Sequence, residues 1–129
     1  IASPESHRLP KRIWDSANKI SKEKNTCLTW TSTPTEAVNG ADIVYTDVWV
    51  SMGDEDEREE RLATFSEYQV NEKLVLHAKP DFIFMHDMPA HRGEEISEGM
   101  LGHPNSVVYK QAENRLHAQK AILAELFGY

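Results

Sequence analysis

Short apolar runs alternate with helical segments along the chain, and this alternation limits the fold more than any other feature. Residues 43–48 (IVYTDV) and 82–85 (FIFM) are rich in β-branched and aromatic side chains, which is typical of strands buried on both faces. Residues 28–31 and 106–108 predict two shorter strands. The chain is therefore expected to contain a sheet built from separated segments.

The segments between these runs carry apolar residues at helical spacing. They predict helices over residues 10–23, 55–65, 71–78 and 112–127, and a capped helical turn over 33–36. Strands that alternate with helices favour a parallel sheet with right-handed crossovers. The sequence thus predicts an α/β fold, a parallel sheet with helices on both faces.

Polar residues follow the two clearest strands. Asp47 lies at the end of the first, and residues 86–89 (HDMP) come directly after the second. In open α/β sheets, ligands bind just beyond the carboxyl ends of the strands. We therefore expect both groups to lie on one rim of the sheet and to form a site there.

Composition excludes several kinds of partner. The 129 residues carry a formal net charge of −7, whereas nucleic acids and anionic membranes attract basic surfaces, so neither is expected as a partner. No apolar run approaches the ~20 residues that span a bilayer. Cys27 is the only cysteine, which prevents an intrachain disulfide and fits a reducing compartment. The histidine spacings match no zinc signature, so no metal site is expected.

The first residues read like the end of a strand that enters a loop. The chain begins Ile1-Ala2-Ser3-Pro4, without an initiator methionine. We therefore expect further chain before residue 1.

Three motifs, in order along the chain, resemble the C-terminal half of ornithine carbamoyltransferase. They are DVWVSMG (47–53), FMHDMPAHRGEEI (84–96) and QAENRLHAQKAIL (111–123), and YQVN (68–71) also fits. The resemblance covers nearly the whole chain. It implies a Rossmann-like ornithine-binding domain over residues 1–129, incomplete at its N-terminal side because the first strand and helix are missing. In this family an N-terminal domain binds carbamoyl phosphate, and the complete protein is usually a homotrimer.

The resemblance assigns ornithine to the first motif. Asp47 would grip the amino group, which is sound because an ammonium ion in a partly dry cleft needs an anionic partner. Ser51 and Met52 would hold the α-carboxylate and backbone of ornithine, and Gly53 would let the loop come close. From the residues alone, Asp47 is better explained as a turn or cap residue after a strand, because carboxylates at loop ends are common.

The resemblance assigns carbamoyl phosphate to the second and third motifs. His86 and Pro89 resemble the ends of the family's His-Cys-Leu-Pro turn, so Asp87 and Met88 would contact this substrate. Arg115 resembles the arginine that polarises the carbamoyl group, although a helical arginine is more often solvated. Asp87 and Arg115 are thus the implied catalytic residues. Asp87 departs from the family, because a carboxylate replaces a thiol and adds a second negative charge beside Asp47.

The implied reaction transfers the carbamoyl group of carbamoyl phosphate to the δ-amine of L-ornithine, giving L-citrulline and phosphate without a cofactor. The isolated chain is expected to be inactive, since the family's phosphate-cradling segment belongs to the other domain. The implied location is cytoplasmic, or the mitochondrial matrix in a eukaryote with a urea cycle. Two alternatives remain: a carbamoyltransferase for another amine, and a relative that only binds or assembles, which Asp87 keeps open.

Overall fold

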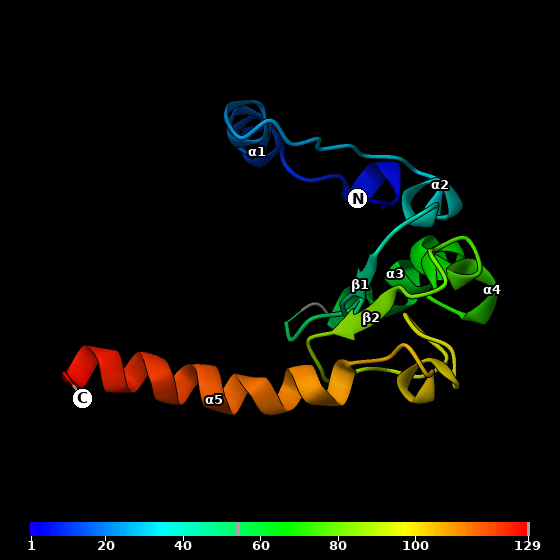
Figure 1. Cartoon of the computed structure of the whole chain (residues 1–129). Coiled ribbons are helices and arrows are strands. Elements are labelled where there is room, and N and C mark those ends of the chain that lie inside the picture. Colours follow the sequence, from blue (N-terminus) through cyan, green and yellow to red (C-terminus); the bar gives the residue numbers. More distant parts are fainter. Residues whose placement is uncertain (54, 129) are drawn as a thin grey trace.

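The computed structural model describes residues 1–53 and 55–128, and its elements follow the predicted alternation of strands and helices (Figure 1). The sheet has two strands, β1 (Ile43–Thr46) and β2 (Ile83–His86). The α-helices are α1 (Lys11–Glu23), α2 (Pro34–Val38), α3 (Arg58–Phe65), α4 (Glu72–Val75) and α5 (Val108–Phe127). Short 3-10 helices are η1 (Glu5–His7), η2 (Glu55–Glu57), η3 (Ser66–Tyr68) and η4 (Met100–Gly102).

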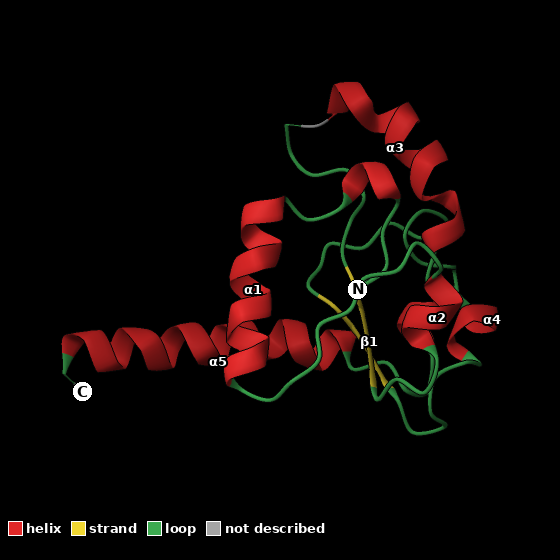
Figure 2. Ribbon diagram, turned by 90° about the horizontal axis from the view of Figure 1, so that it is seen from above, coloured by secondary structure: helices red, strands yellow, loops and turns green. Residues whose placement is uncertain are grey.

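The two strands run parallel, which confirms the predicted pairing. Their register places Thr46 opposite His86, so the residues that follow each strand leave the sheet at the same end. Helices lie on both sides of the strands, as Figure 2 shows from above. The shared rim and the α/β class are therefore confirmed.

The two weaker strands were predicted wrongly. Thr31 makes a single parallel bridge with Ala2, and Ser106 makes one with Phe84. Neither segment continues the pairing, so neither becomes a strand in the described chain. Strand β1 also ends at Thr46, two residues earlier than predicted.

The predicted helices α1, α3 and α5 are confirmed within one to four residues at their ends. Helix α4 is shorter than predicted, and Asn71 caps it by accepting hydrogen bonds from the N–H groups of Lys73 and Leu74 at 3.1 and 2.9 Å. Thr33 precedes α2 but makes no side-chain cap bond, so the predicted capping there is wrong. Helix α5 leaves the body of the molecule and ends at Gly128, whose φ of 74° is left-handed. No helix among the described residues is long and apolar enough to cross a membrane.

The hydrophobic core lies around β2 and the segments that follow it. Phe84, Ile96, Met100 and Val108 are fully buried there. Strand β1 is less protected than predicted, because only Val44 is buried while Ile43 and Tyr45 are 55% and 53% exposed. The expectation that this strand is covered on both faces is therefore wrong for the described chain.

Two ionisable side chains, His86 and Glu95, are also fully buried. His86 Nε2 lies 3.2 Å from Glu95 Oε1, and the same oxygen accepts a hydrogen bond of 2.5 Å from the His91 N–H. Burial is the largest influence and raises the pKa of Glu95, but the hydrogen bonds from His86 and from backbone N–H groups together bring it below the ordinary value. Folding therefore favours the ionised carboxylate.

This pair predicts a pH-dependent stability. The contribution of ionised Glu95 is fully present above its ordinary pKa of 4.5 and is lost as the pH falls through the lower folded value. We expect Glu95→Gln to reduce the free energy of unfolding by about 1.5–3 kcal/mol at neutral pH. The difference from the parent protein should shrink below pH 4.5, as measured by denaturant unfolding.

Glu98→Gln is the matched control, because Glu98 is exposed three residues further on. It should change the unfolding free energy little at either pH. A Glu95→Gln penalty that stays constant from neutral to acidic pH would contradict the role of the charge.

Candidate active site

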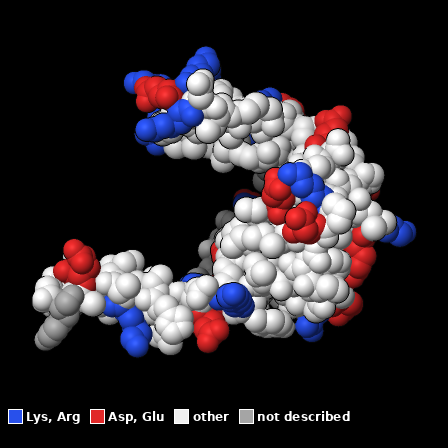
Figure 3. Space-filling view, in the orientation of Figure 1, with Lys and Arg blue, Asp and Glu red and all other residues white. Residues whose placement is uncertain are grey.

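A groove runs along the outer edge of β1. It encloses about 550 Å³ and is lined on one side by Ile1 and Ala2 and on the other by β1. Asp47 and Ser51 lie on its wall. Figure 3 shows the molecule deeply hollowed on this face. The carboxyl end of β1 therefore opens into a space large enough for a ligand.

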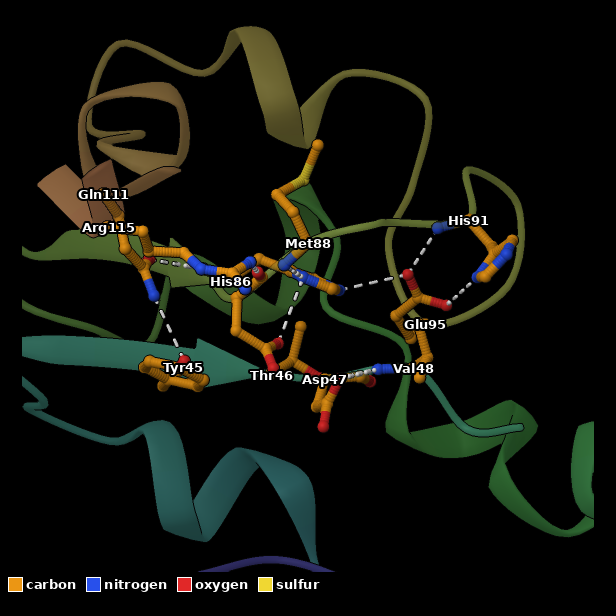
Figure 4. Close-up of polar contacts among 11 residues, drawn as sticks. Tyr45, Thr46, Asp47, Val48, His86, Met88, His91, Glu95, Gln111 and Arg115 are labelled. Atoms are coloured by element: carbon orange, nitrogen blue, oxygen red, sulfur yellow. Dashed lines mark hydrogen bonds and ion pairs between the residues drawn. The ribbon is translucent and has the colours of Figure 1, made fainter. Parts of the chain in front are cut away.

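Asp47 is exposed at this end of the strand. Its Oδ1 accepts a hydrogen bond of 2.6 Å from the Val48 N–H, which fixes the direction of the carboxylate. Figure 4 shows the side chain beyond the tip of β1. Asp47 thus stabilises the turn after β1 through Oδ1, and its exposed carboxylate could still bind a cation.

The loop after Val48 turns at Gly53, whose φ of 97° is favourable only for glycine. The Gly53 N–H donates to Glu55 Oε2 at 2.9 Å, and this bond lowers the pKa of Glu55. Ser51 faces the groove, but Met52 is 98% exposed and does not line it. Ser51 and Asp47 therefore line the same groove, and Met52 lies outside it.

The turn after β2 is held from behind by His86. The Met88 N–H donates to His86 Nδ1 at 2.9 Å, and the following Met88–Pro89 peptide bond is cis. Met88 itself has a left-handed φ of 61°. His86 is fully buried, so it supports the turn and is not itself exposed to a ligand in this structure.

Asp87 projects from the same turn. Its Oδ1 lies 3.5 Å from His86 Nδ1, and in the described chain this buried oxygen has no hydrogen-bond partner. The backbone of Asp87 is tied to α5, because Arg115 Nη1 donates to its carbonyl oxygen at 3.2 Å. The structure therefore places the Arg115 side chain against the backbone of Asp87.

The sequence analysis assigned no role in the site to three residues of this region, Gln111, Tyr45 and Glu95. Gln111 Oε1 accepts from the His86 N–H, and its Nε2 donates to Tyr45 Oη, both at 3.1 Å, so one side chain joins β1, β2 and α5 (Figure 4). Glu95 binds the far side of His86. The four-residue spacing of Gln111 and Arg115 on one helix was the signal that could have revealed the first.

One group of potential metal ligands occurs in the described part of the chain. His91, Glu94 and Glu95 place ligand atoms within 4.8 Å of one another. Glu94 forms an ion pair with Arg58, and Glu95 is bonded to His86 and the His91 N–H. Both carboxylates are thus already engaged by donors of the protein itself.

The geometry suits a ligand with two kinds of polar group. Asp47 on the groove wall can receive an ammonium group, while the turn after β2, together with Arg115 of α5, can receive a carbonyl or anionic group. The parallel register brings the two halves to the same rim.

Comparisons with known proteins identify the family and the fold of the chain. A family model described as "Aspartate/ornithine carbamoyltransferase, Asp/Orn binding domain" matches residues 1–126. Ornithine carbamoyltransferase of Geobacillus stearothermophilus is 53% identical over 95% of this chain, and that of Thermococcus kodakarensis is 49% identical over 99%. The structure of the Pyrococcus furiosus ornithine carbamoyltransferase superposes with a TM-score of 0.87, at 50% identity over 95% of this chain.

The match is confined to part of each relative. The chain spans about 40% of the curated relatives, 40% for Geobacillus and 41% for Thermococcus, and 39% of the Pyrococcus chain. Within those limits the family model, the identities and the superposition all point the same way. The chain belongs to the aspartate/ornithine carbamoyltransferase family and corresponds to its Asp/Orn-binding domain.

Proposed function

We propose that the complete protein is an ornithine carbamoyltransferase and that this chain supplies its ornithine-binding half. The observation that supports this most strongly is the parallel register of β1 and β2. It brings Asp47 and the turn that carries Asp87 and Met88 to one rim, with Arg115 attached to that turn. A cationic amine and a carbamoyl donor could therefore bind side by side.

In the proposed reaction the δ-amine of ornithine attacks the carbamoyl carbon. A C–N bond forms, the bond from that carbon to the phosphate oxygen breaks, and the amine loses a proton. Asp47 would orient the substrate through its ammonium group, with Ser51 beside it. Arg115 and the 87–88 turn would hold the carbamoyl group and the negative charge that develops on it.

The role of Asp87 decides between this proposal and its alternatives. The Asp87 side chain is 46% exposed, so its carboxylate could accept the proton that the amine loses, but its charge also opposes an anionic donor. If the opposition prevails, the protein could be a relative that binds without catalysis. A carbamoyltransferase for another amine is the nearer alternative, and the Ser51-Met52-Gly53 loop favours ornithine because it resembles the loop of the ornithine enzymes that holds the substrate carboxylate.

The groove supports the proposal that the domain is incomplete at its N-terminal side. Among the described residues β1 pairs with β2 on one side only, and its other edge lines the groove opposite Ile1 and Ala2. Ile43 and Tyr45 are also half-exposed on one face of β1, which other parts of the complete protein could cover. A further parallel strand from the rest of the protein would complete the pairing, and the N-terminal carbamoyl-phosphate domain would accompany it.

Three broader features are proposed on the basis of the family alone. The complete protein would assemble as a homotrimer, act in arginine biosynthesis and reside in the cytoplasm, or in the mitochondrial matrix of a eukaryote with a urea cycle. Neither nucleic acid nor membrane would be a partner.

Removing the charge of Asp47 should chiefly weaken ornithine binding. Asp47→Asn keeps the shape and the Val48 contact but deletes the charge that meets the ammonium group. A charged hydrogen bond contributes roughly 1.5–3 kcal/mol, so ornithine affinity should fall by about 10- to 150-fold in calorimetric titration of the complete enzyme.

Asp81→Asn provides the control, because Asp81 is exposed at the opposite end of β2. Its ornithine affinity should equal that of the parent enzyme. An Asp47→Asn variant with unchanged affinity would reduce Asp47 to its role in the turn.

Restoring a thiol at position 87 should improve the binding of the anionic donor. Asp87→Cys removes a negative charge beside the turn that would contact carbamoyl phosphate, so the KM for this substrate should fall and citrulline formation should rise. Asp87→Asn separates the two effects, since it removes the charge without supplying a thiol. If both variants are slower at every substrate concentration, Asp87 is the working proton acceptor.

The 129-residue chain alone should not form citrulline. Among the described residues no further strand borders the groove, and the family's phosphate-binding segment belongs to the other domain. Purified chain is assayed with both substrates against a protein-free reaction, with the complete enzyme as the positive control. Citrulline above the protein-free level would overturn the proposed division of labour between the two halves.

A further inference from the structure

The buried carboxylate of Glu95 contacts the far side of His86 and does not line the groove. It is fully inaccessible, lies on the segment between β2 and η4, and cannot touch a substrate. Its Oε1 is 3.2 Å from His86 Nε2 and also accepts the His91 N–H. A carboxylate is rarely buried without a role, because its desolvation is costly. The question is what this one holds in place.

The two ring nitrogens of His86 have different partners. Nδ1 accepts a hydrogen bond from the Met88 N–H, so in the neutral ring it carries no proton. The proton must then be on Nε2, where the only acceptor among the described residues is Glu95. The opposite tautomer would point an N–H at the Met88 N–H and leave Glu95 facing a lone pair. Its only compensation would be Asp87 Oδ1, which lies 3.5 Å from Nδ1, longer than an ordinary hydrogen bond. Glu95 therefore favours the tautomer that the turn needs.

The turn depends on this support. Met88 adopts a left-handed φ of 61°, which a side chain other than glycine keeps only when its surroundings fix it. His86 Nδ1 fixes the Met88 N–H, Gln111 fixes the His86 N–H, and Arg115 holds the Asp87 carbonyl. The first of these bonds requires an unprotonated Nδ1.

We propose that Glu95 is a positioning residue, which acts through the tautomer of His86 to hold the 87–88 turn in the shape that receives the carbamoyl donor. The inference rests on the proposed function only for the identity of that donor. The chain of contacts runs from Glu95 through the imidazole to the Met88 N–H, and each link is a hydrogen bond of 3.2 Å or less. Figure 4 shows Glu95 joined to the His86 ring, with Met88 beside that ring.

The tautomer itself is the first test, and it needs no variant and no activity. The complete protein is labelled with ¹⁵N-histidine, and the ring signals of His86 are identified by their loss in His86→Asn. We expect a protonated Nε2 and an unprotonated Nδ1 at neutral pH. A proton on Nδ1 would overturn the proposal, whether or not the protein is a carbamoyltransferase.

The second test compares Glu95→Met with Glu95→Gln in the complete enzyme. Methionine has a similar volume but no acceptor oxygen, so it should release the tautomer and raise the KM for carbamoyl phosphate by about 2- to 10-fold, with a smaller effect on the KM for ornithine. Glutamine keeps an acceptor and should restore most of the affinity. Glu98→Met, at an exposed position, is the control and should behave as the parent enzyme.

A double variant shows whether Glu95 acts through His86. In His86→Asn the side-chain carbonyl can still accept from the Met88 N–H but no longer contacts Glu95. Adding Glu95→Met to this background should then leave the KM for carbamoyl phosphate unchanged. An equal KM increase in both backgrounds would overturn the proposal, as would an increase that falls equally on both substrates. A parent enzyme without citrulline formation would refute the proposed function and leave the tautomer result standing.

Discussion

The parallel pairing of β1 with β2 is the constraint on which the rest of this structure depends. Because Thr46 lies opposite His86, the chain leaves both strands at one end, and the residues with chemical function follow immediately. A one-residue slip of β1 would turn Val44 out of the core and move Asp47 relative to the turn after β2. Packing and site geometry are therefore set by the same register.

Behind this rim the molecule uses buried polar groups, and in front of it the side chains are exposed. Gln111 ties together the backbone of His86 and the hydroxyl of Tyr45, so α5 is fastened to both strands by one amide. Asp47 and Met52, by contrast, face solvent. This division is common in binding sites, where a satisfied polar network fixes the backbone and a few open groups meet the ligand.

The sequence predicted the elements with strong periodicity and failed where pairing depends on distant neighbours. The long pattern of α5 and the β-branched runs of both strands were sufficient. Residues 28–31 and 106–108 have strand-like composition, but each finds only one bridge because no partner extends alongside. Within the site, Asp47 follows from its position after a strand. Glu95 could not be predicted, since nothing in a run of loop residues distinguishes a buried carboxylate from the exposed Glu98.

The half-covered edge of β1 also affects the solubility of the isolated chain. An exposed strand edge with apolar side chains can pair with the edge of any other chain, and such pairing starts aggregation. Ile43 and Tyr45 would supply apolar side chains to such a contact. The N-terminal residues across the groove and the net charge of −7 would act against it. Salt screens the repulsion that this charge produces between molecules. The solubility of the isolated chain should therefore fall as ionic strength rises, and it should fall more than that of a chain with a covered edge.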